Sequence, residues 1–116
     1  MDTFRFRNFQ VYKDAKKLNA KIFNLSKSFP LELRSQIVRS ALSIALNIAE
    51  GSAKNSDKDF NRYIENSLGS INETVAALEV ALDLELITSE ICSGLLIEAE
   101  PIAKQLGGLS KKLKSS

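Results

Sequence analysis

The chain has 116 residues, of which 44% are apolar and 26% are charged, and its formal net charge at pH 7 is +2. This length fits one domain that buries a core without metals or disulfides, and the composition excludes global disorder. With no histidine and a single cysteine, histidine acid–base catalysis, histidine metal sites and a disulfide framework are also excluded. No apolar run reaches the length of a membrane span and no signal-like segment follows Met1, so we expect a cytoplasmic protein.

The first half of the chain predicts two helices, because apolar residues recur every three or four positions. The first helix covers about residues 10–28 and ends before Pro30, since the residue that precedes a proline avoids the helical conformation. The second helix covers about residues 32–50. Gly51 is interpreted as its stop, because glycine adopts the left-handed conformation freely.

The second half predicts two longer helices. The third covers about residues 57–86 and begins with Ser56 followed by Asp59, a spacing typical of a helix N-cap. The fourth covers about residues 89–113. Pro101 lies in its middle and is expected to kink the helix or shift its hydrogen bonds.

Four amphipathic helices with short connections predict an all-α fold over residues 1–116, an up-down-up-down bundle with antiparallel neighbours. The second helix has a further apolar face, which includes Leu42 and Leu46, beside its core-facing one. Exposed apolar patches of that size are rare on monomers, so the chain is expected to form a homo-oligomer. The alternative is a helix that simply lies deeper in its own bundle.

Charge is distributed unevenly along the chain. Residues 1–30 hold seven basic and two acidic residues, whereas residues 57–87 hold two basic and seven acidic residues. The basic face of the first helix is open to three interpretations: it binds RNA phosphates, it pairs with the acidic helix of a neighbouring subunit, or it is solvated without a partner. The candidate nucleic-acid-binding residues come from the N-terminal arm, the first helix and the C-terminal tail: Arg5, Arg7, Lys13, Lys16, Lys17, Lys21, Lys111, Lys112 and Lys114.

Phenylalanines alternate with the arginines of the N-terminal arm. Aromatic and arginine side chains together can stack single-stranded bases. The simpler interpretation, which we favour, is that Phe4, Phe6 and Phe9 close one end of the bundle.

A polar line crosses the second helix between its two apolar faces, and a matching line runs along the third. Antiparallel packing of these helices brings Arg39 level with Glu73, and Glu50 level with Arg62. These pairs are predicted to form either within one chain or across subunits. We interpret the line as structural.

No catalytic, cofactor or metal site is predicted. Glu50 and Glu73 stand several turns apart, and the Glu-x-x-His motif of di-iron bundles requires a histidine that the chain lacks. Cys92 is interpreted as a small core residue rather than a reactive thiol.

The motifs of the second and third helices resemble a known family, the four-helix-bundle proteins encoded by 23S rRNA intervening sequences. The resemblance covers about residues 8–87, and its strongest blocks are Asn47-Ile48-Ala49-Glu50-Gly51 and Gly69-Ser70-Ile71-Asn72-Glu73. Tyr12 and Ser67 depart from the family pattern without disturbing the fold. The structural signature positions are Arg39, Ser43, Asn47, Glu50, Gly51, Gly69, Ser70 and Glu73.

The resemblance implies a bundle that assembles into a homopentameric ring. Some members are labelled ribosomal-protein-like, and a related branch, the accessory protein of diversity-generating retroelements, binds nucleic acid. The molecular role of the family is unsettled. We therefore expect a non-enzymatic homo-oligomer that binds RNA or a ribonucleoprotein through the basic face of the first helix. The alternative is a protein-binding scaffold or adaptor that does not contact nucleic acid.

Overall fold

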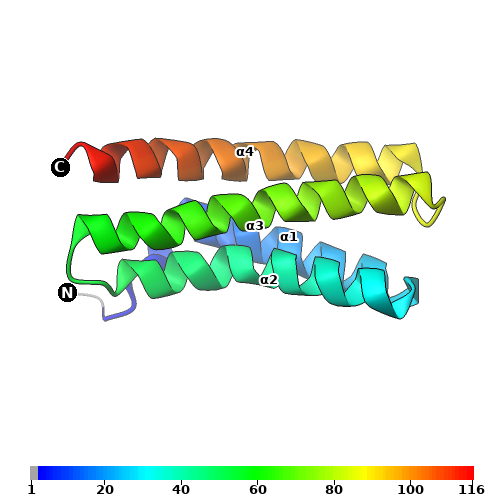
Figure 1. The fold of residues 1–116 in the computed structure, drawn as a ribbon, viewed down its shortest axis with the longest axis horizontal. Coiled ribbons are helices and arrows are strands. Elements are labelled where there is room, and N and C mark those ends of the chain that lie inside the picture. Colours follow the sequence, from blue (N-terminus) through cyan, green and yellow to red (C-terminus); the bar gives the residue numbers. More distant parts are fainter. Residues whose placement is uncertain (1–2) are drawn as a thin grey trace.

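A computed structural model describes residues 3–116 as four α-helices preceded by a short 3-10 helix, with no strand anywhere in that range. The molecule is elongated, with principal extents of 45 × 23 × 21 Å. Along the ribbon in Figure 1, the chain passes down the length of the bundle and turns back at the end of each helix. The all-α prediction with four helices is confirmed.

The N-terminal arm forms a 3-10 helix, η1 (Arg5–Asn8), which leads into α1 (Gln10–Leu25). The helical path then tightens into a second 3-10 turn, η2 (Ser26–Ser28), so that α1 ends three residues before the predicted boundary. Phe29 is extended, as expected before Pro30.

Helix α2 spans Leu31–Ser52 and passes through Gly51, which is buried and has no positive φ angle. The prediction that Gly51 stops the helix was therefore wrong. A Cβ atom built on Gly51 would lie 2.7 Å from Cβ of Tyr63 and 3.0 Å from the ring of Phe60. The position requires glycine because α3 approaches too closely for any side chain.

Helix α3 spans Asp57–Asp83, and the hydroxyl of Ser56 accepts a hydrogen bond from the Asp59 amide at 3.1 Å, which confirms the predicted N-cap. The helix ends three residues before the predicted boundary. Glu85 adopts the left-handed conformation with φ of 59°, and the Leu86 amide donates to the Ala81 carbonyl at 2.9 Å. This is a Schellman ending, with glutamate where glycine is usual.

Helix α4 spans Ser89–Lys114, and the Thr88 hydroxyl accepts from the Ile91 amide to cap its start. The helix continues through Pro101 without interruption. Proline lacks an N–H, so the carbonyl four residues earlier loses its helical partner. Pro101 and Ile97 are both exposed, and water can reach that carbonyl.

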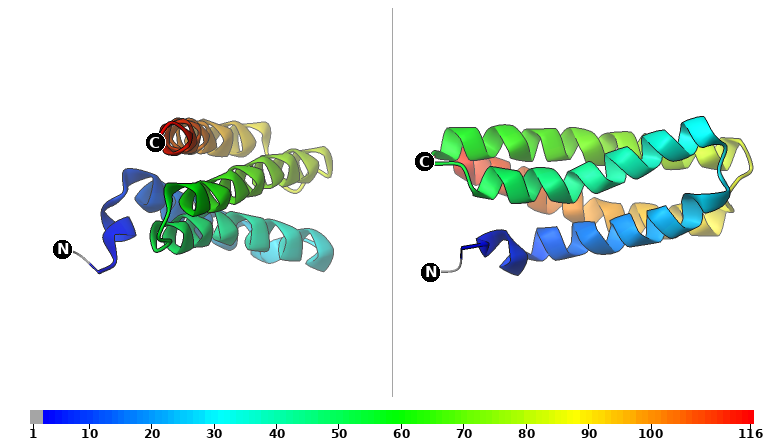
Figure 2. Two further views of the ribbon diagram at one scale, coloured as in Figure 1. Left: turned by 60° about the vertical axis from the view of Figure 1, so that its left-hand side comes forward. Right: turned by 90° about the horizontal axis from the view of Figure 1, so that it is seen from below.

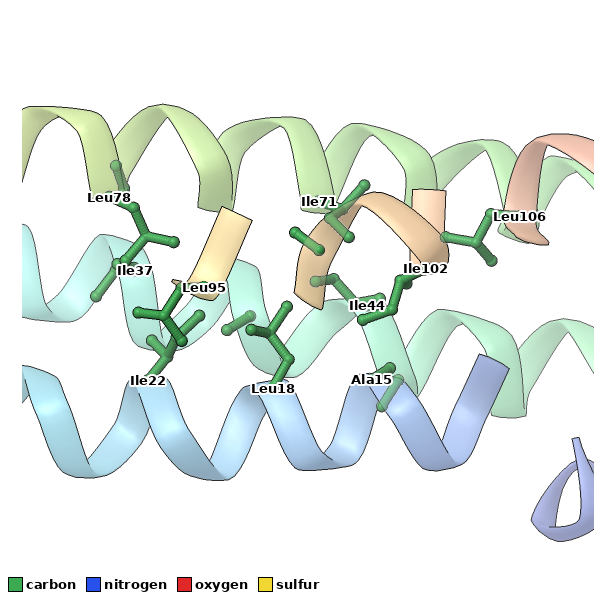
Figure 3. Packing of buried hydrophobic residues seen from close by; sticks show 14 of the residues in the cluster. Ala15, Leu18, Ile22, Ile37, Ile44, Ile71, Leu78, Leu95, Ile102 and Leu106 are labelled. Atoms are coloured by element: carbon green, nitrogen blue, oxygen red, sulfur yellow. The ribbon is translucent and has the colours of Figure 1, made fainter. Parts of the chain in front are cut away.

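The core lies along the axis of the bundle and takes side chains from all four helices (Figure 3). Each helix contributes one stripe at a spacing of three or four residues, as the sequence predicts. The largest fully buried apolar side chains are Leu18, Ile22, Ile37, Ile44, Ile48, Ile64, Ile71, Leu78, Ile102 and Leu106.

Helices α2 and α3 lie side by side, and the left view of Figure 2 shows α3 between α2 and α4. Residue numbers fall along α3 as they rise along α2, because Ser40 meets Thr74 whereas Gly51 meets Phe60. No helix among residues 3–116 is both long enough and apolar enough to cross a membrane.

Candidate functional site

The four lysines of α1 do not share a single free face in the structure. Lys13 and Lys17 are exposed one turn apart on the side of α1 away from the core, and neither makes an ion pair within residues 3–116. Lys16 lies over a ring of its own helix, with its ammonium 5.1 Å from the centre of the Tyr12 ring. Lys21 leans toward α4 and forms a 2.7 Å ion pair with Glu98.

The edge of α1 that faces α4 also carries an acid. Asp14 accepts hydrogen bonds from Gln105 of α4 at 3.0 Å and from Gln10 at 2.8 Å. These bonds, with a smaller contribution from the charge of Lys17, hold the pKa of Asp14 below its ordinary value. The net positive charge of α1 is thus lower on this edge, and Lys13, Lys16 and Lys17 are its exposed lysines without an ion pair within residues 3–116.

Arg5 is held by the fold rather than left free. Its guanidinium donates two hydrogen bonds, of 3.2 and 2.9 Å, to the Ser52 carbonyl at the end of α2. It also lies 5.4 Å from the ring centre of Phe60 and 5.9 Å from that of Phe9. These contacts of Arg5 fix the arm on the bundle, and both Arg5 and Arg7 are exposed.

The phenylalanines of the arm pack mainly on the bundle, as the simpler interpretation predicts. Phe6 contacts Tyr12 edge to face with ring centres 4.8 Å apart, and Phe9 is half-buried at the start of α1. Phe4 is 56% exposed.

The lysines of the C-terminal tail lie at the same end of the bundle as the arm. Arg5 and Lys112 line one cavity of about 390 Å³ together with Phe9 and Phe60. Lys111 is exposed, and Lys114 lies 3.9 Å from Glu65, which is a weak and solvent-exposed contact. Arm and tail thus place several candidate cations near one another.

The polar line between α2 and α3 is partly a set of hydrogen bonds inside the chain. The hydroxyl of Ser43 lies 2.5 Å from that of Ser70, and the side-chain amide of Asn47 donates to the Ser43 carbonyl at 2.8 Å. Three signature residues are therefore linked to one another. The structural role of this line stays a prediction.

Three buried hydroxyl residues also join α2 to α3, and the sequence interpretation missed their role. Thr74 donates to Ser40 at 2.9 Å, and Ser67 donates to the Ile44 carbonyl at 2.6 Å. All three residues are at least 97% buried. The signal in the sequence was a small polar residue at each core-facing turn of the two helices.

The two predicted ion pairs do not form within the chain. Arg39 donates instead to Gln36, one turn earlier, at 3.0 Å, and Arg62 lies 3.9 Å from Asp59. Glu50 and Glu73 are exposed and take part in no ion pair within residues 3–116. The intrachain form of that prediction was therefore wrong, and the form across subunits stays a prediction.

Gly69 differs from Gly51 in its surroundings. It lies on the exposed side of α3, and a Cβ atom built there would meet nothing within 4 Å. A glycine inside a helix is less favourable than alanine by about 1 kcal/mol. Packing within the chain gives no reason for glycine at this position.

The described residues were predicted to hold no metal site, and Cys92 was predicted to be a core residue. No group of three or more acidic, cysteine or histidine side chains is placed to hold a metal ion within residues 3–116. Cys92 is buried in the core as predicted, and burial raises the pKa of its thiol, with further increases from Glu79 and Asp83.

Comparison with known proteins identifies one family. The family described as 23S rRNA-intervening sequence protein matches residues 7–108. No curated protein matches the chain. The fold is similar to a crystal structure of a protein of unknown function from the S23 ribosomal protein family of Bacteroides thetaiotaomicron, with a TM-score of 0.82 and 26% sequence identity; the match covers 87% of this chain and 98% of that one.

Proposed function

Because the chain belongs to the 23S rRNA-intervening sequence protein family, we propose that it is a homo-oligomeric bundle that binds RNA through the outward lysines of α1. It acts by binding rather than by catalysis. Lys13 and Lys17 carry this proposal, because they are exposed, lie one turn apart and have no ion-pair partner within residues 3–116. Contact with phosphates needs cations and no further chemistry.

Assembly compensates for the low net charge of one chain. We propose an up-down-up-down antiparallel bundle that closes into a ring of five copies, as the family resemblance implies. The opposite numbering of α2 and α3 at their contacts supports the antiparallel order, and the exposed Leu42 and Leu46 support self-association. A ring repeats Lys13 and Lys17 in every copy and so builds one larger basic surface.

RNA binding is tested by fluorescence anisotropy with a short single-stranded RNA. The double variant Lys13→Glu/Lys17→Glu is expected to weaken binding by about tenfold or more and to lower the salt dependence, because phosphate contacts release counterions. Lys104→Glu is the matched control, since Lys104 is an exposed lysine on α4. Equal affinity of the double variant and the wild type, at an unchanged mass, would contradict RNA binding by α1.

Self-association is measured by light scattering after size exclusion, without RNA. The expected mass is about five times the 12.8 kDa of one chain. A mass of one chain at every concentration would contradict the assembly.

A second candidate function, a protein-binding scaffold, is favoured by an apolar groove between α1 and α4. The groove has a volume of about 340 Å³, and Leu25, Ile91 and Leu95 form much of its lining beside the Lys21–Glu98 ion pair. Capture of a partner protein that survives nuclease and high salt would support this function over RNA binding, because phosphate contacts weaken steeply with salt.

A further inference from the structure

The outer surface of α2 carries two exposed leucines between two opposite charges. Leu42 and Leu46 are 42% and 55% exposed, one turn apart. Arg39 lies one turn before them and Glu50 one turn after them, and both are exposed. At 1.5 Å per residue, the two charges are separated by about 16 Å along the helix.

The outer surface of α3 carries the complementary arrangement. Arg62 and Glu73 are exposed and separated by the same number of residues as Arg39 and Glu50. Gly69 and Asn66 lie between them, also exposed, and Gly69 faces open space. One helix therefore presents bulky side chains between its charges, and the other presents a small and a polar one.

We propose that these two surfaces bind each other between two copies of the chain, α2 of one copy lying antiparallel to α3 of the other. Arg39 then meets Glu73 and Glu50 meets Arg62, because both spacings are equal and the signs are opposite. In this register Leu42 falls at the level of Gly69, and Leu46 falls at the level of Asn66. The inference rests on the self-association proposed above and specifies its interface.

Three observations favour a second copy over another partner. The charges of α2 and α3 match in sign and spacing, so this chain by itself supplies both sides of the contact. Within one chain neither ion pair forms: Arg39 donates to Gln36, and Arg62 lies 3.9 Å from Asp59 in an exposed contact that is weak. Gly69 has no neighbour in its own chain, and a closely packed helix of a second copy explains why a residue unfavourable in helices stands there.

Charge reversal with mixing tests the contact. Arg39→Glu places two acids opposite each other across copies, and Glu73→Arg places two arginines there. Each variant alone is expected to lose mass toward 12.8 kDa in light scattering, because like charges at an interface oppose binding. An equimolar mixture of the two is expected to gain mass over either variant alone, since every contact between unlike copies again joins opposite charges.

The mixture separates contact across copies from contact within a chain, because mixing cannot repair an intrachain pair. The contact is wrong if the single variants keep the wild-type mass, or if the mixture stays dissociated. Circular dichroism checks that each variant retains its helices. If wild type is itself monomeric, self-association fails as a whole; if wild type assembles and the variants are unaffected, only this interface fails.

A steric variant tests the same contact without changing charge. Gly69→Leu meets nothing in its own chain, so the bundle is expected to fold, but the added side chain occupies the space proposed for Leu42. Loss of the oligomer is expected. Gly94→Leu is the matched control, because Gly94 is also exposed and open but lies on α4; it is expected to keep the wild-type mass. Normal assembly of Gly69→Leu would overturn the proposed contact.

Discussion

Helix α3 and helix α1 both pack against a neighbouring helix, but they do so in different ways. Between α2 and α3, buried hydroxyls hydrogen-bond across the two helices, and Gly51 lets the backbones approach closely. Between α1 and α4, the polar contacts lie near the surface, where Lys21 pairs with Glu98 and Gln105 donates to Asp14, beside an open apolar groove.

The difference indicates where stability and adaptability lie. A buried hydrogen bond that loses a partner leaves an unsatisfied group, which costs about 1–3 kcal/mol. An exposed ion pair contributes about 0–1 kcal/mol. The polar contacts between α2 and α3 are therefore expected to stabilise the bundle more than those between α1 and α4, and the residues proposed to bind RNA stand on α1.

The largest expected effect comes from filling the close contact of α2 and α3. Gly51→Ala is expected to lower the free energy of unfolding by about 1–3 kcal/mol, because its Cβ would lie against Cβ of Tyr63, which cannot move without the backbone. Urea unfolding followed by circular dichroism measures the change. Gly94→Ala is the control and is expected to raise stability slightly, since Gly94 is an exposed helical glycine with open space around it. If Gly51→Ala were as stable as the wild type, the α2–α3 contact would not differ from the α1–α4 contact in the way described above.

A smaller decrease in the free energy of unfolding is expected when one hydroxyl is removed from the contact between α2 and α3. Thr74→Val keeps the shape of the side chain but ends its donation to Ser40, and it is expected to lower the free energy of unfolding by about 1 kcal/mol. Thermal unfolding at fixed protein concentration measures it. Ser93→Ala, at an exposed position on α4, is the control. A neutral Thr74→Val would show that the hydroxyl contacts add little to packing.

The smallest effect on stability is expected at the contact between α1 and α4, where the contribution of Asp14 depends on pH. The hydrogen bonds from Gln105 and Gln10 lower the pKa of Asp14 in the folded state, so the carboxylate stabilises the fold above its ordinary pKa of 3.8. This contribution is lost as pH falls from that value through the lower folded-state pKa. In thermal unfolding, the melting temperature of the wild type is expected to fall between about pH 5 and pH 2. For Asp14→Asn this decrease is expected to be slightly smaller. Identical pH profiles for the two proteins would contradict the role of Asp14.

Much of the fold could be predicted from the sequence, because helical periodicity and capping are local properties. The stripe through Leu18 and Ile22 and the N-cap at Ser56 follow from residues within a few turns of one another. The end of α3 could not be predicted, because the residue at the left-handed position is Glu85 rather than glycine. The role of Gly51 was also missed, since it depends on Tyr63 in the next helix.

The candidate site shows the same division. The positions of Lys13, Lys16, Lys17 and Lys21 place them together on a helical wheel. In the folded chain, Lys16 lies over Tyr12 of its own helix and Lys21 pairs with Glu98 of α4. Pairing of Arg39 with Glu73 was likewise left open between one chain and two, and the structure shows no such pair within the chain. Side-chain reach across a helix pair depends on how each helix is rotated, and that rotation follows from packing.

By itself, then, the sequence determines four helices, their apolar faces, the family resemblance and the opposite charges of the first and third helices, since each is written in local spacing and composition. Only the tertiary structure decides that Arg5 is bound to the Ser52 carbonyl, that Ser67 and Thr74 join two helices, and that Gly69 faces open space. These features depend on the distance and rotation between helices, which arise from the simultaneous packing of all four core stripes.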